Sequence, residues 1–573
     1  MIPVTFNDCF GWLHAPGDDV AGDVGVVICP GLMRDGLLAY CSLRLLADEL
    51  AAVGYWALRF DYPGTGDSCD GAIEREGGHW PAWMKSVDQA ADWLRAQTGV
   101  RRLVLCGLRT GATLATLIAA RREDAAGLLL FEPVTNGRSY VRQLILEADL
   151  QSGKTSTRGE ALEIRDFRLS AATLDSMAAV DLRRTGLGAV RKVAVFSRPE
   201  TRQIDECVQA WAAAGVEATA YGWDGLVPLM RHSVIDENVL ADFSGARGWF
   251  KDAMPPVRAV SLPASARAPE PAELRPPGCV ETPLRFGNGR LVGILCRPAQ
   301  GASDQVMLIG NGGRDPHYGA ARQNVDFARH LAQLGVSCLR FDFAGLGDSL
   351  GPPGKENVLS ETFADRLQDI GAALDALEAL GYRRFSMLGL CSGAYHAFHG
   401  ALADQRLAGL LLVNMPLFVL PKANVLEFLE ERGRSPMTYV RKLFHPGSWV
   451  TLLSGRTNIR TSVRALSTHI ARQVRSKTQG LARRAGLLKE QSFAVQAMAA
   501  LSQRGARVLF LFSPGETEID AFAREFGANG EGLAAFPGSA VTVLPRMDHD
   551  LTIATGRNDA KAVVAGFLLA MRQ

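Results

Sequence analysis

A duplicated motif constrains the fold of this 573-residue chain more than any other feature. The run Leu-Arg-Phe-Asp-Tyr-Pro-Gly-Thr-Gly-Asp-Ser at residues 58–68 returns as Leu-Arg-Phe-Asp-Phe-Ala-Gly-Leu-Gly-Asp-Ser at residues 339–349, an offset of 281 from Asp61 to Asp342. An apolar run ending in Cys-Pro-Gly at 29–31 returns as one ending in Gly-Asn-Gly at 310–312. A third run, Gly-Leu-Arg-Thr-Gly at 107–111, returns as Gly-Leu-Cys-Ser-Gly at 389–393. Three motifs at nearly constant spacing predict a tandem duplication.

Each copy alternates short apolar strands with helical patterns, which predicts a mostly parallel sheet covered by helices on both faces. We therefore expect two tandem α/β domains, at residues 1–243 and 278–573. The stretch 244–277 is rich in Pro and Ala and lacks sustained periodicity, which is typical of a linker. A chain of 573 residues is also too long for one core of ordinary size.

The run at 389–393 predicts a sharp strand-to-helix turn that presents a nucleophile. Such a turn needs very small residues two positions before and two after its central residue, because the backbones approach closely there. Gly389 and Gly393 meet that rule only if Cys391 is central. If Ser392 were central, the flanking positions would be Leu390 and Ala394, and the leucine would clash. The spacing favours a thiol nucleophile.

The first copy places Arg109 at the equivalent position, so we expect a degenerate and catalytically silent site. A guanidinium stays protonated and cannot attack a carbonyl, and Thr110 lies one position too late. A cation at a helix N-terminus is unfavourable unless it is paired, which predicts an anion nearby, either a carboxylate of this half or one on a ligand. His232 is either a relic of a catalytic base or an ordinary surface histidine.

Both halves resemble α/β-hydrolases of the serine-aminopeptidase-like group, through the shared pattern Arg-Phe-Asp-x-x-Gly-x-Gly-Asp-Ser. The first half further resembles the second type of exosortase-A-associated hydrolases, through residues 107–111 and Glu-Pro-Val-Thr-Asn-Gly-Arg-Ser-Tyr at 132–140. The second half resembles the first type, through residues 389–393 and Leu-Leu-Ser-Gly-Arg at 452–456. The resemblance implies two tandem α/β-hydrolase domains, each with a helical cap insertion, and a link with exopolysaccharide or exosortase systems.

In this fold the chain order is nucleophile, acid, histidine, so the partners of Cys391 lie downstream. His549, which follows a strand-like run near the C-terminus, is the expected base. The acid is expected after the apolar run 508–512, where Glu516 matches the position in the family best. Glu518 and Asp520 remain alternatives, because charges of this sign also favour a helix N-terminus.

Two backbone donors are expected to form an oxyanion hole. One is the N–H of Ser392, directly after the nucleophile, and the other is the N–H of Gly312 or Gly313 in the glycine-rich loop at 310–313. An ordinary glycine turn is the alternative reading of that loop.

The predicted chemistry is acyl transfer at a thiol. A helix N-terminus and a nearby imidazole favour the thiolate, which exchanges readily with thioesters. We expect an enzyme that acts on ester or thioester acyl groups through a covalent acyl-cysteine intermediate. The alternatives are an acyltransferase or thioesterase that works with a carrier protein or coenzyme A, and a binding or scaffold protein without turnover. No cofactor or metal is predicted.

A basic segment lies within the predicted helical cap of the catalytic domain, at about 414–502. From Arg432 to Lys489 the chain holds thirteen Lys or Arg residues and no Asp or Glu, although the whole chain has a net charge of only +2. Interleaved Tyr439, Phe444 and Trp449 would suit an anionic membrane surface or a phosphate-bearing acyl donor. No motif points to nucleic acid.

The composition predicts a cytoplasmic protein. The N-terminus has no basic region followed by an apolar run, and no uncharged apolar segment is long enough to cross a bilayer. The ten cysteines lack paired metal-ligand spacing, and several lie in strand-like runs, as Cys29, Cys106 and Cys338 do. Reduced, mostly buried thiols are the simplest interpretation.

Overall fold

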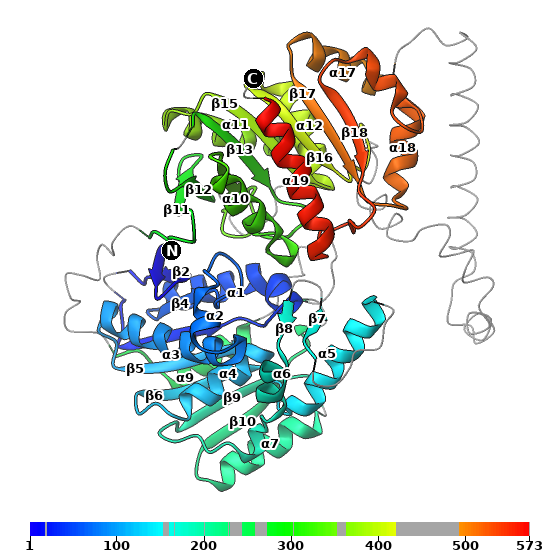
Figure 1. The fold of residues 1–573 in the computed structure, drawn as a ribbon. Helices are drawn as coiled ribbons and strands as arrows, with labels where there is room; N and C mark the ends of the chain where they lie inside the picture. The colour runs from blue at the N-terminus through cyan, green and yellow to red at the C-terminus, as the bar shows by residue number, and fades with distance from the viewer. Residues whose placement is uncertain are drawn as a thin grey trace, which may run out of the picture.

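The chain forms two domains that each contain an eight-stranded sheet (Figure 1). This computed structural model describes residues 1–17, 20–152, 160–164, 167–199, 201–226, 229, 243–257, 272–301, 303–351, 363–419 and 492–571. The strand orders are β1-β2-β4-β3-β5-β6-β9-β10 and β11-β12-β14-β13-β15-β16-β17-β18. The two sheets therefore have the same topology. The predicted duplication is therefore a duplication of fold.

In the N-terminal domain the sheet is antiparallel at one edge and parallel elsewhere. Strands β1 and β2 pair antiparallel with each other, β2 pairs antiparallel with β4, and the strands from β4 to β10 run parallel. The strands are β1 (Ile2–Phe6), β2 (Cys9–His14), β3 (Val24–Cys29), β4 (Trp56–Phe60), β5 (Arg102–Leu108), β6 (Ala125–Phe131), β9 (Lys192–Ser197) and β10 (Glu217–Gly222), with a small separate hairpin of β7 (Leu162–Ile164) and β8 (Phe167–Leu169).

Helices cover both faces of this sheet. One face packs against α1 (Arg34–Ala52) and α9 (Ser244–Ala253). The other packs against α3 (His79–Thr98), α4 (Thr110–Ala119), α5 (Gly137–Ser152), α6 (Ala171–Ala178) and α7 (Arg202–Ala213), with the short α2 (Gly71–Arg75) before them. The central strands are buried on both faces, which explains why β3 is apolar without alternation.

The C-terminal domain repeats this plan. Its strands are β11 (Cys279–Phe286), β12 (Leu291–Pro298), β13 (Gln305–Gly310), β14 (Ser337–Phe341), β15 (Arg384–Leu390), β16 (Leu407–Val413), β17 (Arg507–Phe512) and β18 (Ser539–Val543). One face packs against α10 (Gln323–Gln333) and α19 (Ala554–Ala570), and the other against α11 (Phe363–Ala379), α12 (Ser392–Ala403), α17 (Phe493–Gln503) and α18 (Thr517–Phe526). The carboxyl ends of the parallel strands gather the loops in which the candidate site residues lie.

The structure departs from the predicted linker at its start. Residues 244–253 form helix α9, in which Ala246, Trp249 and Phe250 are buried against the N-terminal sheet. The hydroxyl of Tyr55 donates to the carbonyls of Phe250 and Met254 at 3.0 Å each. The apolar residues recur at a spacing of three and four, but over only ten residues the pattern is too short to stand out from its Pro-rich surroundings.

The predicted basic cap falls mostly outside the described residues, as do His232 and the basic run from 432 to 489. Of the predicted range 414–502, the described end is α17, whose Ala494, Met498 and Leu501 pack into the core of the domain rather than over the site. Within the described ranges, no helix combines the length and the apolarity needed to cross a bilayer.

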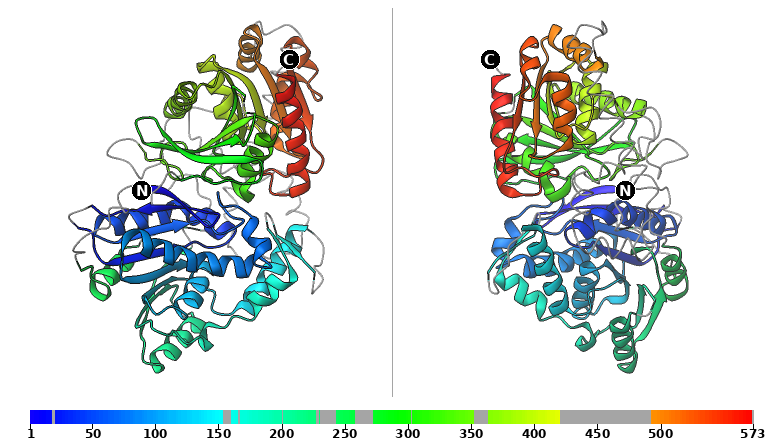
Figure 2. Two further views of the ribbon diagram at one scale, coloured as in Figure 1. Left: turned by 60° about the vertical axis from the view of Figure 1, so that its left-hand side comes forward. Right: turned by 90° about the vertical axis from the view of Figure 1, so that its right-hand side faces the viewer.

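The two domains meet through the antiparallel edges of their sheets and their duplicated motif loops, and Figure 2 shows one domain above the other with this contact between them. Phe10 and Trp12 of β2 form an apolar cluster with Val292 and Ile294 of β12. Around this cluster, charged residues of the two motifs are buried against each other, as in the pair of Arg340 with Asp67. The candidate catalytic domain therefore shares a buried interface with its degenerate copy.

Candidate active site

Cys391 occupies a strained turn between β15 and α12. Its backbone has φ 52° and ψ −116°, outside the regions that L-residues normally adopt, and Ser392 is the first residue of the helix. The equivalent Arg109 of the N-terminal domain has φ 55° and ψ −120° between β5 and α4. The turn that the glycine spacing predicts is therefore present in both domains, with Cys391 and Arg109 at its centre.

The glycines on either side of Cys391 are sterically required. A Cβ on Gly389 would overlap the backbone carbonyl of Gly393, and a Cβ on Gly393 would lie 2.7 Å from the carbonyl oxygen of Asn311. The copy shows the same crowding at Gly107 and Gly111. The rule that selected Cys391 over Ser392 thus rests on contacts that leave no room for a side chain.

His549 lies between Cys391 and Glu516. Its Nδ1 lies 3.1 Å from Oε2 of Glu516, and a hydrogen bond with the sulfur of Cys391 and another with Glu516 raise the pKa of His549 to about 11. Burial raises the pKa of Glu516, but the hydrogen bond and the charge of His549, together with a hydrogen bond to Glu518, outweigh burial and lower it. An imidazolium between a carboxylate and a thiol is the arrangement that a cysteine nucleophile uses.

Of the three carboxylates predicted as the acid, only Glu516 contacts the histidine in the described structure. Glu518 is buried and accepts a hydrogen bond from the hydroxyl of Thr517 at 3.1 Å. Asp520 is exposed on α18. The first turn of that helix is the place where negative charge is favoured, which accounts for both residues.

The glycine-rich loop lies against the start of α12, where a donor to an oxyanion is expected. The N–H of Gly313 donates to the hydroxyl oxygen of Ser392 at 2.8 Å, so this N–H already has a partner. The copy repeats the contact, because the N–H of Leu32 donates to the hydroxyl of Thr110 at 3.0 Å. Within the described chain, the N–H groups of Gly312 and Ser392 have no hydrogen-bond partner.

Asn414 joins three loops of the candidate site and was not predicted. It directly follows β16, is fully buried and has φ 47°. Its Nδ2 donates to the hydroxyl of Ser513 and to the backbone carbonyl of His549, both at 2.9 Å, and its Oδ1 accepts from the N–H of Ser513 at 2.8 Å. Its place at the carboxyl end of a central strand is the signal that could have identified it.

The degenerate site of the N-terminal domain is internally neutralised. The Nε of Arg109 lies 3.2 Å from Oδ2 of Asp35, so a carboxylate of the same half supplies the anion expected there. Burial raises the pKa of Asp35 in spite of that pairing. Arg109 therefore holds a structural ion pair at the position equivalent to Cys391.

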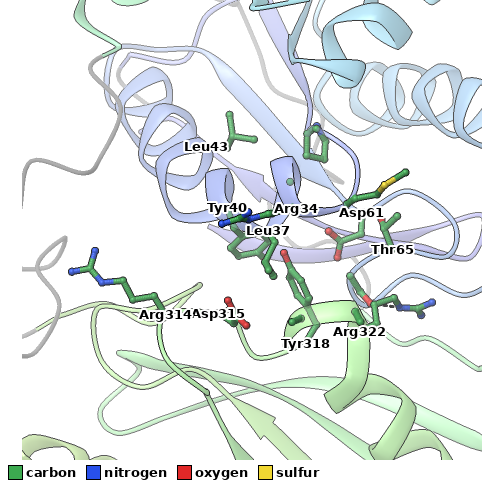
Figure 3. A pocket seen from close by; sticks show the side chains of 18 of the residues that line it. Arg34, Leu37, Tyr40, Leu43, Asp61, Thr65, Arg314, Asp315, Tyr318 and Arg322 are labelled. Carbon is green, nitrogen blue, oxygen red and sulfur yellow. Dashed lines mark hydrogen bonds between the residues drawn. The ribbon is translucent and has the colours of Figure 1, made fainter. Parts of the chain in front are cut away.

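A cavity of about 390 Å³ lies between the domains and reaches Cys391 and His549. Figure 3 shows side chains of both domains facing each other across it, with Arg34, Leu37 and Tyr40 on one side and Asp315 and Tyr318 on the other. The N-terminal domain therefore forms a wall of the space in front of the thiol.

Comparisons with known families match the two halves separately. The serine aminopeptidase S33 family matches residues 25–164, and the alpha/beta hydrolase family matches residues 306–565. No curated protein sequence matches the chain.

Solved structures also resemble the chain, at low identity. An esterase of Pyrococcus furiosus is 16% identical, with 51% of this chain and 90% of that one covered and a TM-score of 0.32. Est1E of Butyrivibrio proteoclasticus with ferulic acid bound is 13% identical, covering 39% and 89%, with a TM-score of 0.31. A hypothetical protein of Pseudomonas aeruginosa is 16% identical, covering 50% and 91%, with a TM-score of 0.31.

The sheet order, the strained turn with its two glycines and the two family matches agree on the fold of each half. The chain is a tandem of two α/β-hydrolase domains.

Proposed function

We propose that the C-terminal domain cleaves ester or thioester acyl groups through a covalent acyl-cysteine intermediate at Cys391. The observation that carries this proposal is the position of His549, which is hydrogen-bonded both to the thiol of Cys391 at the centre of the turn and to Glu516. A thiol held by an imidazole is a stronger nucleophile at neutral pH than an isolated one. The cavity in front of it provides room for an acyl group.

In the proposed first step the sulfur of Cys391 attacks the carbonyl carbon, and the bond from that carbon to the leaving oxygen or sulfur breaks. His549 gives its proton to the leaving alkoxide or thiolate, and Glu516 stabilises the imidazolium until then. The N–H groups of Ser392 and Gly312, which have no other partner in the described chain, would bind the oxyanion. Water then attacks the acyl group, His549 takes its proton, and the carbon–sulfur bond breaks.

Transfer to an acceptor other than water uses the same intermediate. In that case the acyl donor or acceptor would be a coenzyme A or carrier-protein thiol. The resemblance of the halves to exosortase-A-associated hydrolases supports a substrate from that setting. The N-terminal domain takes no covalent part in this proposal, because its equivalent position holds Arg109 in an ion pair with Asp35.

The test is mass spectrometry of the intact protein after mixing with p-nitrophenyl butyrate. We expect a butyryl adduct on the native protein, no adduct on Cys391→Ala, and slow formation on His549→Gln. An adduct that persists in Cys391→Ala would overturn the proposal. If added pantetheine makes the butyryl adduct disappear faster than it does in buffer alone, the enzyme transfers the acyl group to thiols. If pantetheine does not change the rate of loss, the enzyme hydrolyses the adduct.

A further inference from the structure

The interdomain cavity contains a carboxylate whose duplicated counterpart is fully bound. Asp61 lines the cavity, and its counterpart in the other half is Asp342. Asp342 accepts hydrogen bonds from Asn311 Nδ2 at 2.8 Å and from the N–H of His317 at 2.7 Å, and its Oδ2 lies 2.8 Å from His317 Nδ1. The N–H of Asp348 adds a fourth contact at 2.9 Å.

Of these four contacts, Asp61 has the equivalent of only one, the hydrogen bond from the backbone N–H six residues later. Its Oδ2 accepts from the N–H of Asp67 at 3.0 Å, and no other hydrogen bond reaches its carboxylate from the described parts of the chain. The duplication explains the difference. At the offset of 281 residues, Pro30 stands where the second half has Asn311, and Gly36 stands where it has His317.

Pro30 and Gly36 both line the cavity. Neither carries a side-chain donor, so the donors that satisfy Asp342 have no replacement at Asp61. Asp61 and both of these positions line the same cavity, so a ligand in the cavity can reach the carboxylate of Asp61.

The charges around Asp61 favour a cation. Burial and the negative charge of Asp67 raise the pKa of Asp61 to about 7, in spite of the hydrogen bond from Asp67 and the charge of His317. Two of the guanidinium groups that line the cavity, those of Arg59 and Arg322, are committed elsewhere. Arg59 is paired with Asp348 at 2.8 Å, and Arg322 donates from Nε to the carbonyl of Gly66 at 2.8 Å and from Nη2 to that of Ser68.

Aromatic rings form another part of the cavity wall. Tyr40 and Tyr318 pack edge to face with centroids 5.4 Å apart, one from each domain, and Figure 3 shows them beside Asp61 and Thr65. A carboxylate beside aromatic rings is a favourable environment for an organic cation, because the ring faces are electron-rich; the guanidinium of Arg59 already lies over the ring of Tyr40, 5.2 Å from its centroid.

We propose that Asp61 binds a cationic nitrogen group, an ammonium or a guanidinium, of the molecule that enters the interdomain cavity. The ligand then supplies the N–H donors that Asn311 and His317 supply to Asp342. The inference deepens the proposed function, on which it rests only in taking this molecule to be the acyl substrate of Cys391.

Binding is measured by calorimetry on Cys391→Ala protein, so the result does not depend on catalysis. The probes are benzylammonium and its neutral analogue benzyl alcohol. We expect benzylammonium to bind at least tenfold more tightly than benzyl alcohol. Asp61→Asn keeps an acceptor for the N–H of Asp67 but removes the charge, and should weaken benzylammonium binding at least tenfold.

A matched control separates Asp61 from the general charge of the cavity. Asp315 lines the same cavity, and burial and Asp550 raise its pKa to about 7 as well. Asp315→Asn should change benzylammonium binding less than threefold. Equal losses in the two variants, or equal affinity for both probes, would overturn the proposal.

A second variant restores the missing donor instead of removing the acceptor. Pro30→Asn copies Asn311 and should satisfy Asp61 internally, which weakens benzylammonium binding severalfold. Unchanged binding in Pro30→Asn together with unchanged binding in Asp61→Asn would place the cation elsewhere. Because these measurements need no thiol, they stand or fall separately from acylation of Cys391.

Discussion

Arg340 Nη2 lies 2.8 Å from Asp67 Oδ1, across the boundary between the two domains. The duplicated pair repeats the contact in the opposite direction, with Arg59 Nη2 2.8 Å from Asp348 Oδ1. The Arg and the final Asp of each motif are thus buried partners of the other motif. The shared motif therefore forms two reciprocal ion pairs between the domains, Arg340 with Asp67 and Arg59 with Asp348, which we call the interdomain clamp.

Breaking this clamp should be costly. Arg340 also binds Glu281 at 2.7 Å and is completely buried, so Arg340→Met removes one of the two charged partners of each carboxylate, leaving Asp67 with His317 and Glu281 with Arg329. We expect the free energy of unfolding to fall by about 3–5 kcal/mol, as measured by urea denaturation. Arg384→Met, which removes the exposed pair with Asp304, is the control and should cost less than about 1 kcal/mol. Similar losses in both variants would contradict the clamp.

His317 should make the stability depend on pH. Burial alone would lower its pKa, but Asp67 and Asp342, at 2.6 and 2.8 Å, outweigh burial and raise it well above its ordinary value. A raised pKa in the folded state stabilises the protein fully below the unfolded value of about 6.5, and this contribution is lost as pH rises through the folded value.

The stability difference between the native protein and His317→Gln should therefore be largest near pH 6. It should shrink by up to about 1.4 kcal/mol per pH unit above pH 7, measured by urea denaturation across pH 6 to 9. A difference that grows with pH would mean that His317 is neutral in the folded protein.

The position of Cys391 could be predicted because its cause is local. Two glycines at fixed spacing are required by backbone contacts within the same turn, and those contacts are the ones observed at Gly389 and Gly393. The choice among Glu516, Glu518 and Asp520 could not be made in the same way. All three lie within five residues, and only the folded position of His549 distinguishes them.

The interdomain contacts were beyond sequence reasoning for a different reason. Arg59 and Arg340 belong to a motif shared by both halves, so nothing in either copy indicates that its partner lies in the other. The comparison of Pro30 with Asn311 also acquires meaning only when the cavity beside Asp61 is known.

Ser392 should support the site without reacting in it. Its hydroxyl accepts from the N–H of Gly313, as that of Thr110 accepts from the N–H of Leu32 in the copy that has Arg109 at the centre of the turn. Ser392→Ala should keep the butyryl adduct on Cys391 and lower kcat by roughly threefold to tenfold, the effect of one lost hydrogen bond of about 1 kcal/mol. The measurement is ester hydrolysis with intact-mass analysis. Loss of the adduct in Ser392→Ala together with its retention in Cys391→Ala would make Ser392 the nucleophile.

Asn414 should act as a positioning residue, because it touches the backbone of His549 and the Ser513 loop but not the thiol. Asn414→Ala removes the donor that fixes the carbonyl of His549 and leaves buried groups unpaired, at about 1–3 kcal/mol each. We expect kcat to fall by roughly tenfold to a hundredfold with KM nearly unchanged, because the histidine is displaced while the cavity is not.

The readout specific to positioning is the rate of alkylation of Cys391 by iodoacetamide at pH 7, which should fall in parallel with kcat. Asn414→Asp retains the acceptor for the N–H of Ser513 and loses the donor, so it should resemble Asn414→Ala in rate while unfolding at higher urea. A variant that loses stability but keeps the native alkylation rate would reduce Asn414 to a purely structural role.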